Sequence, residues 1–171
     1  MTTNDTSKTM LSAIIIDDEP HNRDTLGKLI KRYCPGLMVA GKAEGVRTGI
    51  EAIRVLKPDI VFLDVNMSDG TAFDLLHALV PVDFRVILVS ALDKDTIRAF
   101  RLSGMEYLLK PVSPEELKMA VERVIKAEVK HFALQLEALE GNIRLVRRLD
   151  NWTVKLFCLF NLTAFAEPVS A

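Results

Sequence analysis

Short runs of apolar residues alternate with amphipathic stretches along most of this chain. The runs lie at residues 11–16, 37–43, 59–65, 85–91 and 107–109. Continuous β-branched runs of this length are typical of strands buried on both faces, as in a parallel sheet. The stretches between them have the length of helices and lie at residues 20–33, 46–57, 71–79 and 95–103. The alternation therefore predicts a doubly wound α/β fold, a five-stranded parallel sheet with right-handed crossovers.

A further helix is predicted from Ser113 onward, because a serine N-cap, a proline at the first helical position and a glutamate three residues after the cap follow one another. Its pattern continues beyond the length that a five-stranded sheet can cover. Apolar residues spaced alternately by four and three positions form a stripe: Ile125, Val129, Phe132, Leu136, Leu139, Ile143 and Val146. The stripe is either the core face of one long helix or a seam for a second copy of the chain. Beyond Lys126, burial in a homodimer is the more economical alternative.

The composition of the chain excludes some classes of protein but does not indicate a function. Of the 171 residues, 49% are hydrophobic and 26% are charged, and the net charge is −1, so neither wholesale disorder nor a global basic excess for nucleic acid or membranes is indicated. Cys34 and Cys158 make neither a disulfide framework nor a metal quartet, which favours a reducing compartment. Residues 1–10 lack the apolar segment of a signal peptide, and no run of about 18 apolar residues could span a membrane. We expect a cytoplasmic protein without a membrane partner.

These patterns divide the chain into four parts. We expect a disordered N-terminus at 1–10, an α/β domain at 11–126, a helical extension or linker at 127–150 and an apolar tail at 151–171. The tail is rich in aromatic residues and poor in charge. It is predicted to be a strand or the remnant of an output domain.

Polar residues stand at the ends of four predicted strands. The first run ends in Asp17 and Asp18, the third in Asp64, the fourth in Ser90 and the fifth in Lys110. Functional groups of open α/β sheets gather outside the carboxyl ends of the strands, so these side chains are expected to converge. Clustered carboxylates repel unless a cation lies among them, and a set of oxygen ligands favours Mg²⁺ over Zn²⁺. With a lysine, a hydroxyl and a carboxylate nucleophile, the site is equipped for phosphoryl transfer.

Each of these residues also has a structural explanation. An acidic pair after a strand is usually a loop or a helix cap, Ser90 alone is most often a strand-end hydroxyl, and Lys110 before a proline is a turn. The joint occurrence at strands one, three, four and five makes the functional interpretation specific.

Four segments together resemble the receiver domains of two-component response regulators: Ile14-Ile15-Ile16-Asp17-Asp18-Glu19-Pro20, Phe62-Leu63-Asp64-Val65-Asn66-Met67, Val89-Ser90-Ala91 and Tyr107-Leu108-Leu109-Lys110-Pro111-Val112. The resemblance covers residues 11–126 and implies a flavodoxin-like sheet of order 2-1-3-4-5. It implies that Asp64 accepts a phosphoryl group from a sensor histidine kinase. The implied Mg²⁺ ligands are Asp17, Asp18, Asp64 and the main-chain carbonyl of Asn66.

The same resemblance assigns a switch. Ser90 and Lys110 would bind phosphoryl oxygens, Tyr107 would follow the position of Ser90, and the peptide bond before Pro111 would be cis. One departure follows Met67, because Ser68 stands at the usual proline and Ala72 at a common glycine. The departure predicts a more mobile loop and puts the lifetime of the phosphoryl group in question.

The finer pattern is similar to the receivers of LytTR-type (LytR/AlgR) regulators. Three features carry this similarity: Asp17-Asp18-Glu19-Pro20, Asn22-Arg23 and the ending Tyr107-Leu108-Leu109-Lys110-Pro111. Such regulators normally carry a DNA-binding domain after a helical linker. Too few residues follow Gly141 for that domain. We therefore expect DNA to be a partner only if a missing output domain is present in a longer protein.

The leading hypothesis is a phosphorylation switch and not a turnover enzyme. Phosphorylation of Asp64 would reset the face formed by residues 95–103, the fifth strand and the last helix, and with it the helical extension. A phosphatase with an aspartyl intermediate would use the same carboxylates, although such enzymes usually show Asp-x-Asp after the first strand. An interaction module would dimerise through the extension whatever the state of Asp64.

Overall fold

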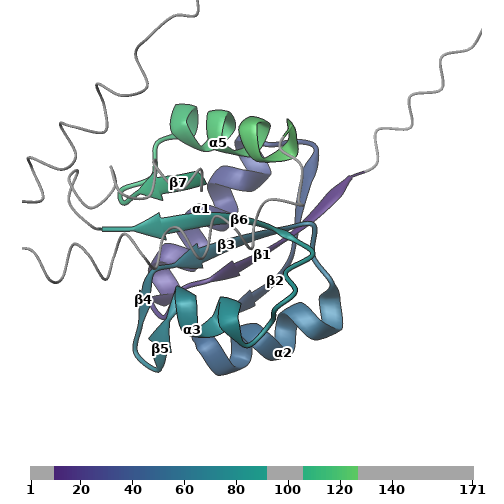
Figure 1. Cartoon of the computed structure of the whole chain (residues 1–171). Helices are drawn as coiled ribbons and strands as arrows, with labels where there is room; N and C mark the ends of the chain where they lie inside the picture. Colours follow the sequence, from purple (N-terminus) through teal and green to yellow (C-terminus); the bar gives the residue numbers. More distant parts are fainter. Residues whose placement is uncertain (1–9, 92–105, 127–171) are drawn as a thin grey trace, which may run out of the picture.

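The computed structural model describes residues 10–91 and 106–126, which form one parallel sheet covered by helices on both faces (Figure 1). The sheet has five strands in the order β2-β1-β3-β6-β7, all paired in parallel. They are β1 (Leu11–Ile16), β2 (Leu37–Ala43), β3 (Ile60–Asp64), β6 (Arg85–Ser90) and β7 (Glu106–Leu109). Counted over these five strands alone, the order is the predicted 2-1-3-4-5, so the predicted fold class is confirmed.

Within residues 10–91 and 106–126, four helices cover the sheet, two on each face (Figure 1). One pair is α1 (Pro20–Tyr33) and α5 (Pro114–Lys126), and the other is α2 (Val46–Leu56) and α3 (Ala72–His77). Successive strand residues point to opposite faces, so Ile14 and Ile16 pack toward α2 and α3 while Ile15 packs toward α1 and α5. Both faces of β1 and β3 are therefore buried, which explains why their sequences are continuous apolar runs.

The predicted helix at 20–33 has the observed bounds, whereas the one predicted at 71–79 is shorter and covers Ala72–His77. Two short strands that were not predicted, β4 (Asn66–Met67) and β5 (Gly70–Thr71), pair in an antiparallel hairpin between β3 and α3. The predicted helix at 95–103, nearly all of the N-terminal segment, the extension at 127–150 and the tail at 151–171 lie outside the described residues.

Among the helices of the described ranges, none combines the length and apolar composition that crossing a membrane requires.

Candidate functional site

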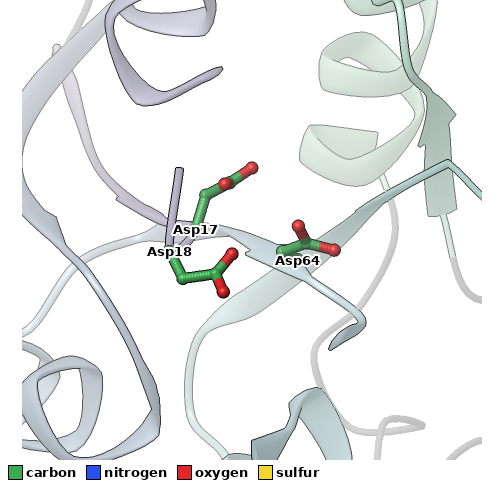
Figure 2. Close-up of side chains that lie close together, drawn as sticks. All are labelled: Asp17, Asp18 and Asp64. Atoms are coloured by element: carbon green, nitrogen blue, oxygen red, sulfur yellow. The ribbon is translucent and has the colours of Figure 1, made fainter. Parts of the chain in front are cut away.

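Three carboxylates meet where β1 and β3 end, as Figure 2 shows. Asp17 and Asp18 follow β1, and Asp64 is the last residue of β3, which lies beside β1 in the sheet. One oxygen of each carboxylate lies within 4.8 Å of the others. Asp17 is 4% exposed and Asp64 is 7% exposed, whereas Asp18 is half-buried. The convergence predicted from the strand ends is present for all three residues.

Lys110 joins this cluster from the end of β7. Its Nζ lies 2.7 Å from Oδ2 of Asp17 and 2.5 Å from Oδ2 of Asp64. Its main-chain N–H donates to the carbonyl of Ser90 at 2.9 Å, which holds the segment after β7 against the end of β6. The peptide bond between Lys110 and Pro111 is cis, as is the bond between Val80 and Pro81.

Burial and charge act in opposite directions on these groups. Burial raises the pKa of Asp64 above its ordinary value, although the hydrogen bond and positive charge of Lys110 counteract that rise. Burial alone would lower the pKa of Lys110, but its hydrogen bonds with Asp17 and Asp64 outweigh burial and raise that pKa. Lys110 therefore stays cationic at neutral pH and compensates part of the clustered negative charge.

Asp17 is held by the start of α1 as well as by Lys110. Its Oδ1 accepts the main-chain N–H of Glu19 at 2.9 Å, and its main-chain carbonyl accepts a hydrogen bond from the Arg23 guanidinium. Each side-chain oxygen of Asp17 thus has a different partner, since Oδ2 meets Lys110. The role of Arg23 at this site was not predicted from the sequence.

The β4–β5 hairpin (residues 66–71) supplies two main-chain donors. The N–H of Asn66 lies 3.3 Å from Oδ1 of Asp64, and the N–H of Ser68 donates to Oδ2 of Asp18 at 3.0 Å. Asn66 is thus placed two residues after Asp64, with its side chain exposed. The donor at Ser68 was missed by the sequence analysis, although the signal was there, because a proline at that position would have no N–H.

The predicted switch residues lie on the two strands beyond β3. Ser90 is buried at the end of β6, next to Val89, which is paired with Asp64 in the sheet. Tyr107 lies in β7 and packs, half-buried, against the core beneath α2 and α3. Of the predicted dimer stripe, only Ile125 belongs to the described residues, and 43% of it is exposed on α5.

The net negative charge of this cluster favours the binding of a cation. Three carboxylates stand against one lysine that contacts two of them, so the cluster as a whole is negative. All its side-chain ligand atoms are oxygens, which is the donor set that hard divalent cations such as Mg²⁺ prefer. A buried carboxylate nucleophile beside a lysine and such a cation site is suited to phosphoryl transfer.

Most of the described part of the chain matches a known protein family. Residues 13–122 match the response regulator receiver domain family. An uncharacterized response regulatory protein of Vibrio vulnificus is 41% identical over 126 residues, which make up 73% of this chain and 51% of that protein. The sensory transduction protein LytT of Enterococcus faecalis is 30% identical over 118 residues, 68% of this chain and 48% of that protein. The chain spans about half the length of the curated relatives it matches.

Solved structures show the same fold at lower identity. The RcsB response regulator of Salmonella typhimurium is similar with a TM-score of 0.59 and 19% identity, covering 75% of this chain and 68% of that one. A DNA-binding response regulator of the LuxR family from Staphylococcus aureus is similar with a TM-score of 0.58 and 23% identity, covering 67% and 98%.

Proposed function

Because this chain belongs to the response regulator receiver domain family of two-component systems, with LytT proteins among its relatives, we propose that it is a phosphorylation switch in the cytoplasm. In this proposal Asp64 accepts a phosphoryl group from a sensor histidine kinase. The observation that carries it is the contact of Lys110 with both Asp64 and Asp17 beside a third carboxylate. A nucleophile and a cationic partner for the arriving phosphoryl oxygens are then in one place.

The proposed transfer uses groups that the fold already positions. A carboxylate oxygen of Asp64 forms a bond to phosphorus while the bond between phosphorus and the kinase histidine breaks. The N–H of Asn66 and the ammonium of Lys110 orient the two oxygens of Asp64 before transfer. After transfer, Lys110 would exchange its contact with the Asp64 carboxylate for a phosphoryl oxygen, and the Ser90 hydroxyl would turn toward another.

Mg²⁺ fits the residues that surround Asp64. Asp17, Asp18 and Asp64 would hold it, and one oxygen of each lies close enough to the others to share one ion. In the proposal, the main-chain carbonyl of Asn66 would complete this set. When bound, Mg²⁺ would offset the negative charge that accumulates on the phosphoryl oxygens. The chain's own contribution is to hold three carboxylates close together against their mutual repulsion, with Lys110 offsetting part of their charge.

The proposed output is a change on the side of the sheet where β7 and α5 lie. Tyr107 is on β7, the strand paired with the one that ends in Ser90. In the proposal, a turn of the Ser90 side chain toward Asp64 would change the space available to the Tyr107 ring. The chain corresponds to about half of its curated relatives, so we propose DNA binding only for a longer protein that carries an output domain.

A second candidate function is dimerisation through the helical extension. The observation in its favour is Ile125, a large apolar residue that is 43% exposed near the end of α5 and begins the stripe predicted from the sequence. Making Phe132 and Leu139 polar should abolish a dimer detected by sedimentation. If that dimer forms equally with and without a phosphoryl group on Asp64, the switch proposal loses its output and the interaction module is favoured.

The switch is tested by intact-mass spectrometry after incubation with Mg²⁺ and a small phosphodonor such as acetyl phosphate. We expect one added phosphoryl group that is stable in acid and is removed by hydroxylamine, as an acyl phosphate should be. Asp64→Ala should take up none. Asp83→Ala is the matched control, because this exposed carboxylate precedes β6 and so lies at the opposite end of the strands.

Equal uptake by Asp64→Ala and wild type would refute the assignment of Asp64. Steady release of phosphate from a monoester over many turnovers would favour the phosphatase alternative instead.

A further inference from the structure

The hairpin that follows the phosphoryl-acceptor site is fastened to helix α2 by Asp69. Oδ1 of Asp69 accepts the main-chain N–H of Val46 at 2.8 Å, and Oδ2 accepts that of Arg47 at 3.1 Å. These are the first two residues of α2, whose own N-cap residue provides no side-chain hydrogen bond. Asp69 therefore caps a helix that begins 23 residues earlier in the chain.

Gly45, the N-cap residue of α2, permits this close approach. A Cβ atom at Gly45 would lie 2.7 Å from Cγ of Asp69, which is closer than real Cβ contacts allow. The two hydrogen bonds from the helix lower the pKa of Asp69, so its carboxylate is charged at neutral pH. The geometry at Gly45 and the charge of Asp69 thus favour the same contact.

The residue before Asp69 makes a contact with the acidic cluster. The N–H of Ser68 donates to Oδ2 of Asp18 at 3.0 Å. Asp18 is the half-buried member of the three carboxylates. The Lys110 ammonium contacts the other two, Asp17 and Asp64, and the main-chain N–H of Glu19 donates to Asp17. Ser68 is adjacent to Asp69, so this donor lies on the segment that Asp69 attaches to α2.

We propose that Asp69 is a positioning residue for the phosphoryl-transfer site: by anchoring the β4–β5 hairpin on α2, it places the Ser68 N–H on Asp18 and so orients a Mg²⁺ ligand. This inference rests on the proposed function and extends it to a residue outside the acidic cluster.

The proposal is tested by titrating the full chain with Mg²⁺ alone in a calorimeter, which needs no phosphodonor. Groups that orient a metal ligand typically change affinity about tenfold or more when they are removed. We expect Asp69→Ala to raise the Mg²⁺ dissociation constant about tenfold. Amide hydrogen exchange of Val46 and Arg47 should accelerate in the same variant, because their acceptor is lost.

Two control variants separate anchoring from charge. Asp69→Asn removes the negative charge but keeps one oxygen that can accept the Val46 N–H, so it should retain most of the wild-type affinity. Asp83→Ala removes an equal charge at the far end of the strands and should leave the affinity unchanged. If Asp69→Asn binds Mg²⁺ as weakly as Asp69→Ala, charge rather than anchoring is responsible and the proposal is wrong.

A pair of Ser68 variants tests whether Asp69 acts through this N–H, and it keeps the proposal testable if Asp69→Ala does not fold. Ser68→Pro removes the donor to Asp18, whereas Ser68→Ala keeps it. We expect weaker Mg²⁺ binding only for the proline variant. The double variant Ser68→Pro with Asp69→Ala should bind no more weakly than Ser68→Pro alone, since both changes remove the same contact.

The results distinguish this inference from the proposed function. Wild-type affinity in Asp69→Ala or in Ser68→Pro, or additive losses in the double variant, would overturn the positioning role. A wild-type chain that accepts no phosphoryl group while Asp69→Ala still weakens Mg²⁺ binding would refute the proposed function and leave the positioning role supported.

Discussion

Lys110→Met tests how far one lysine holds the acidic cluster together. Lys110 is the ion-pair partner of both Asp17 and Asp64, and these carboxylate side chains are only 5% and 10% exposed. Removing one partner of a fully buried pair costs about 3–5 kcal/mol, because the remaining charge stays desolvated. The Lys110 side chain is 19% exposed, so water can replace part of its contribution. We therefore expect a loss of about 2–4 kcal/mol in the free energy of unfolding without Mg²⁺.

Urea unfolding followed by far-UV circular dichroism measures this loss. With a denaturant slope of about 2 kcal/mol per molar urea, the midpoint should fall by about 1–2 M. Lys28→Met is the matched control, because Lys28 is exposed on α1, and it should change stability by less than about 0.5 kcal/mol.

Adding Mg²⁺ gives a second measurement on the same variant. At ten times its dissociation constant, a ligand stabilises the folded state by about 1.4 kcal/mol. At a fixed Mg²⁺ concentration, the gain should be larger for Lys110→Met than for wild type, because the variant cluster carries one positive charge fewer. Equal urea midpoints without Mg²⁺, or equal gains with it, would refute the view that Lys110 and the cation share the compensation of these carboxylates.

Four further substitutions give expected outcomes that the same unfolding experiment can measure. Gly27→Ala in α1 should stabilise the protein by about 0.5–1 kcal/mol, because a Cβ there would meet only ordinary contacts. Gly49→Ala in α2 should destabilise it by about 1–2 kcal/mol, because its Cβ would lie 2.8 Å from a side-chain carbon of Leu75. Changes in the free energy of unfolding with the same sign for both variants would contradict this reasoning. Thr71→Ala removes the capping box of α3 and should cost about 1 kcal/mol, and no loss would show that the cap is dispensable. Hydrogen bonds from Thr71 hold the pKa of Asp74 below 3.8, so the stabilisation by Asp74 is present above its unfolded pKa and is lost as the pH falls through the lower folded value. Asp74→Asn should therefore reduce the decline of the free energy of unfolding below about pH 4. The same decline in the variant and the wild type would show that Asp74 does not contribute to it.

The strand ends show what a sequence pattern can predict about this protein. Apolar runs identify β1, β3 and β6 because a strand buried on both faces needs apolar side chains at every position. Parallel strands bring their carboxyl ends to one edge, so Asp17, Asp64 and Lys110 could be placed together before any contact was known. The β4–β5 hairpin gave no such signal, since two-residue strands are too short to show a period.

The pattern of apolar runs and strand ends could not predict contacts made by main-chain groups. The Ser68 N–H on Asp18 and the Asp69 carboxylate on the start of α2 join residues 50 and 23 positions apart. Every residue other than proline carries the same N–H, so the sequence shows that Ser68 offers a donor but not which acceptor this donor meets. The prediction that this loop is more mobile came from the absent proline and glycine, and it stays a prediction beside the contacts found.

The sequence by itself thus determined the fold class, the strand order implied by its family resemblance, and the set of residues at the acidic edge. Periodicity and residue chemistry are local properties, and burial on both faces of a parallel sheet follows from them. Only the tertiary structure decided how the oxygens are shared, with Lys110 between Asp17 and Asp64 and the hairpin donor on Asp18. The path of the chain between the strands decides which donor meets which oxygen, because a hydrogen bond depends on distances of a few tenths of an ångström.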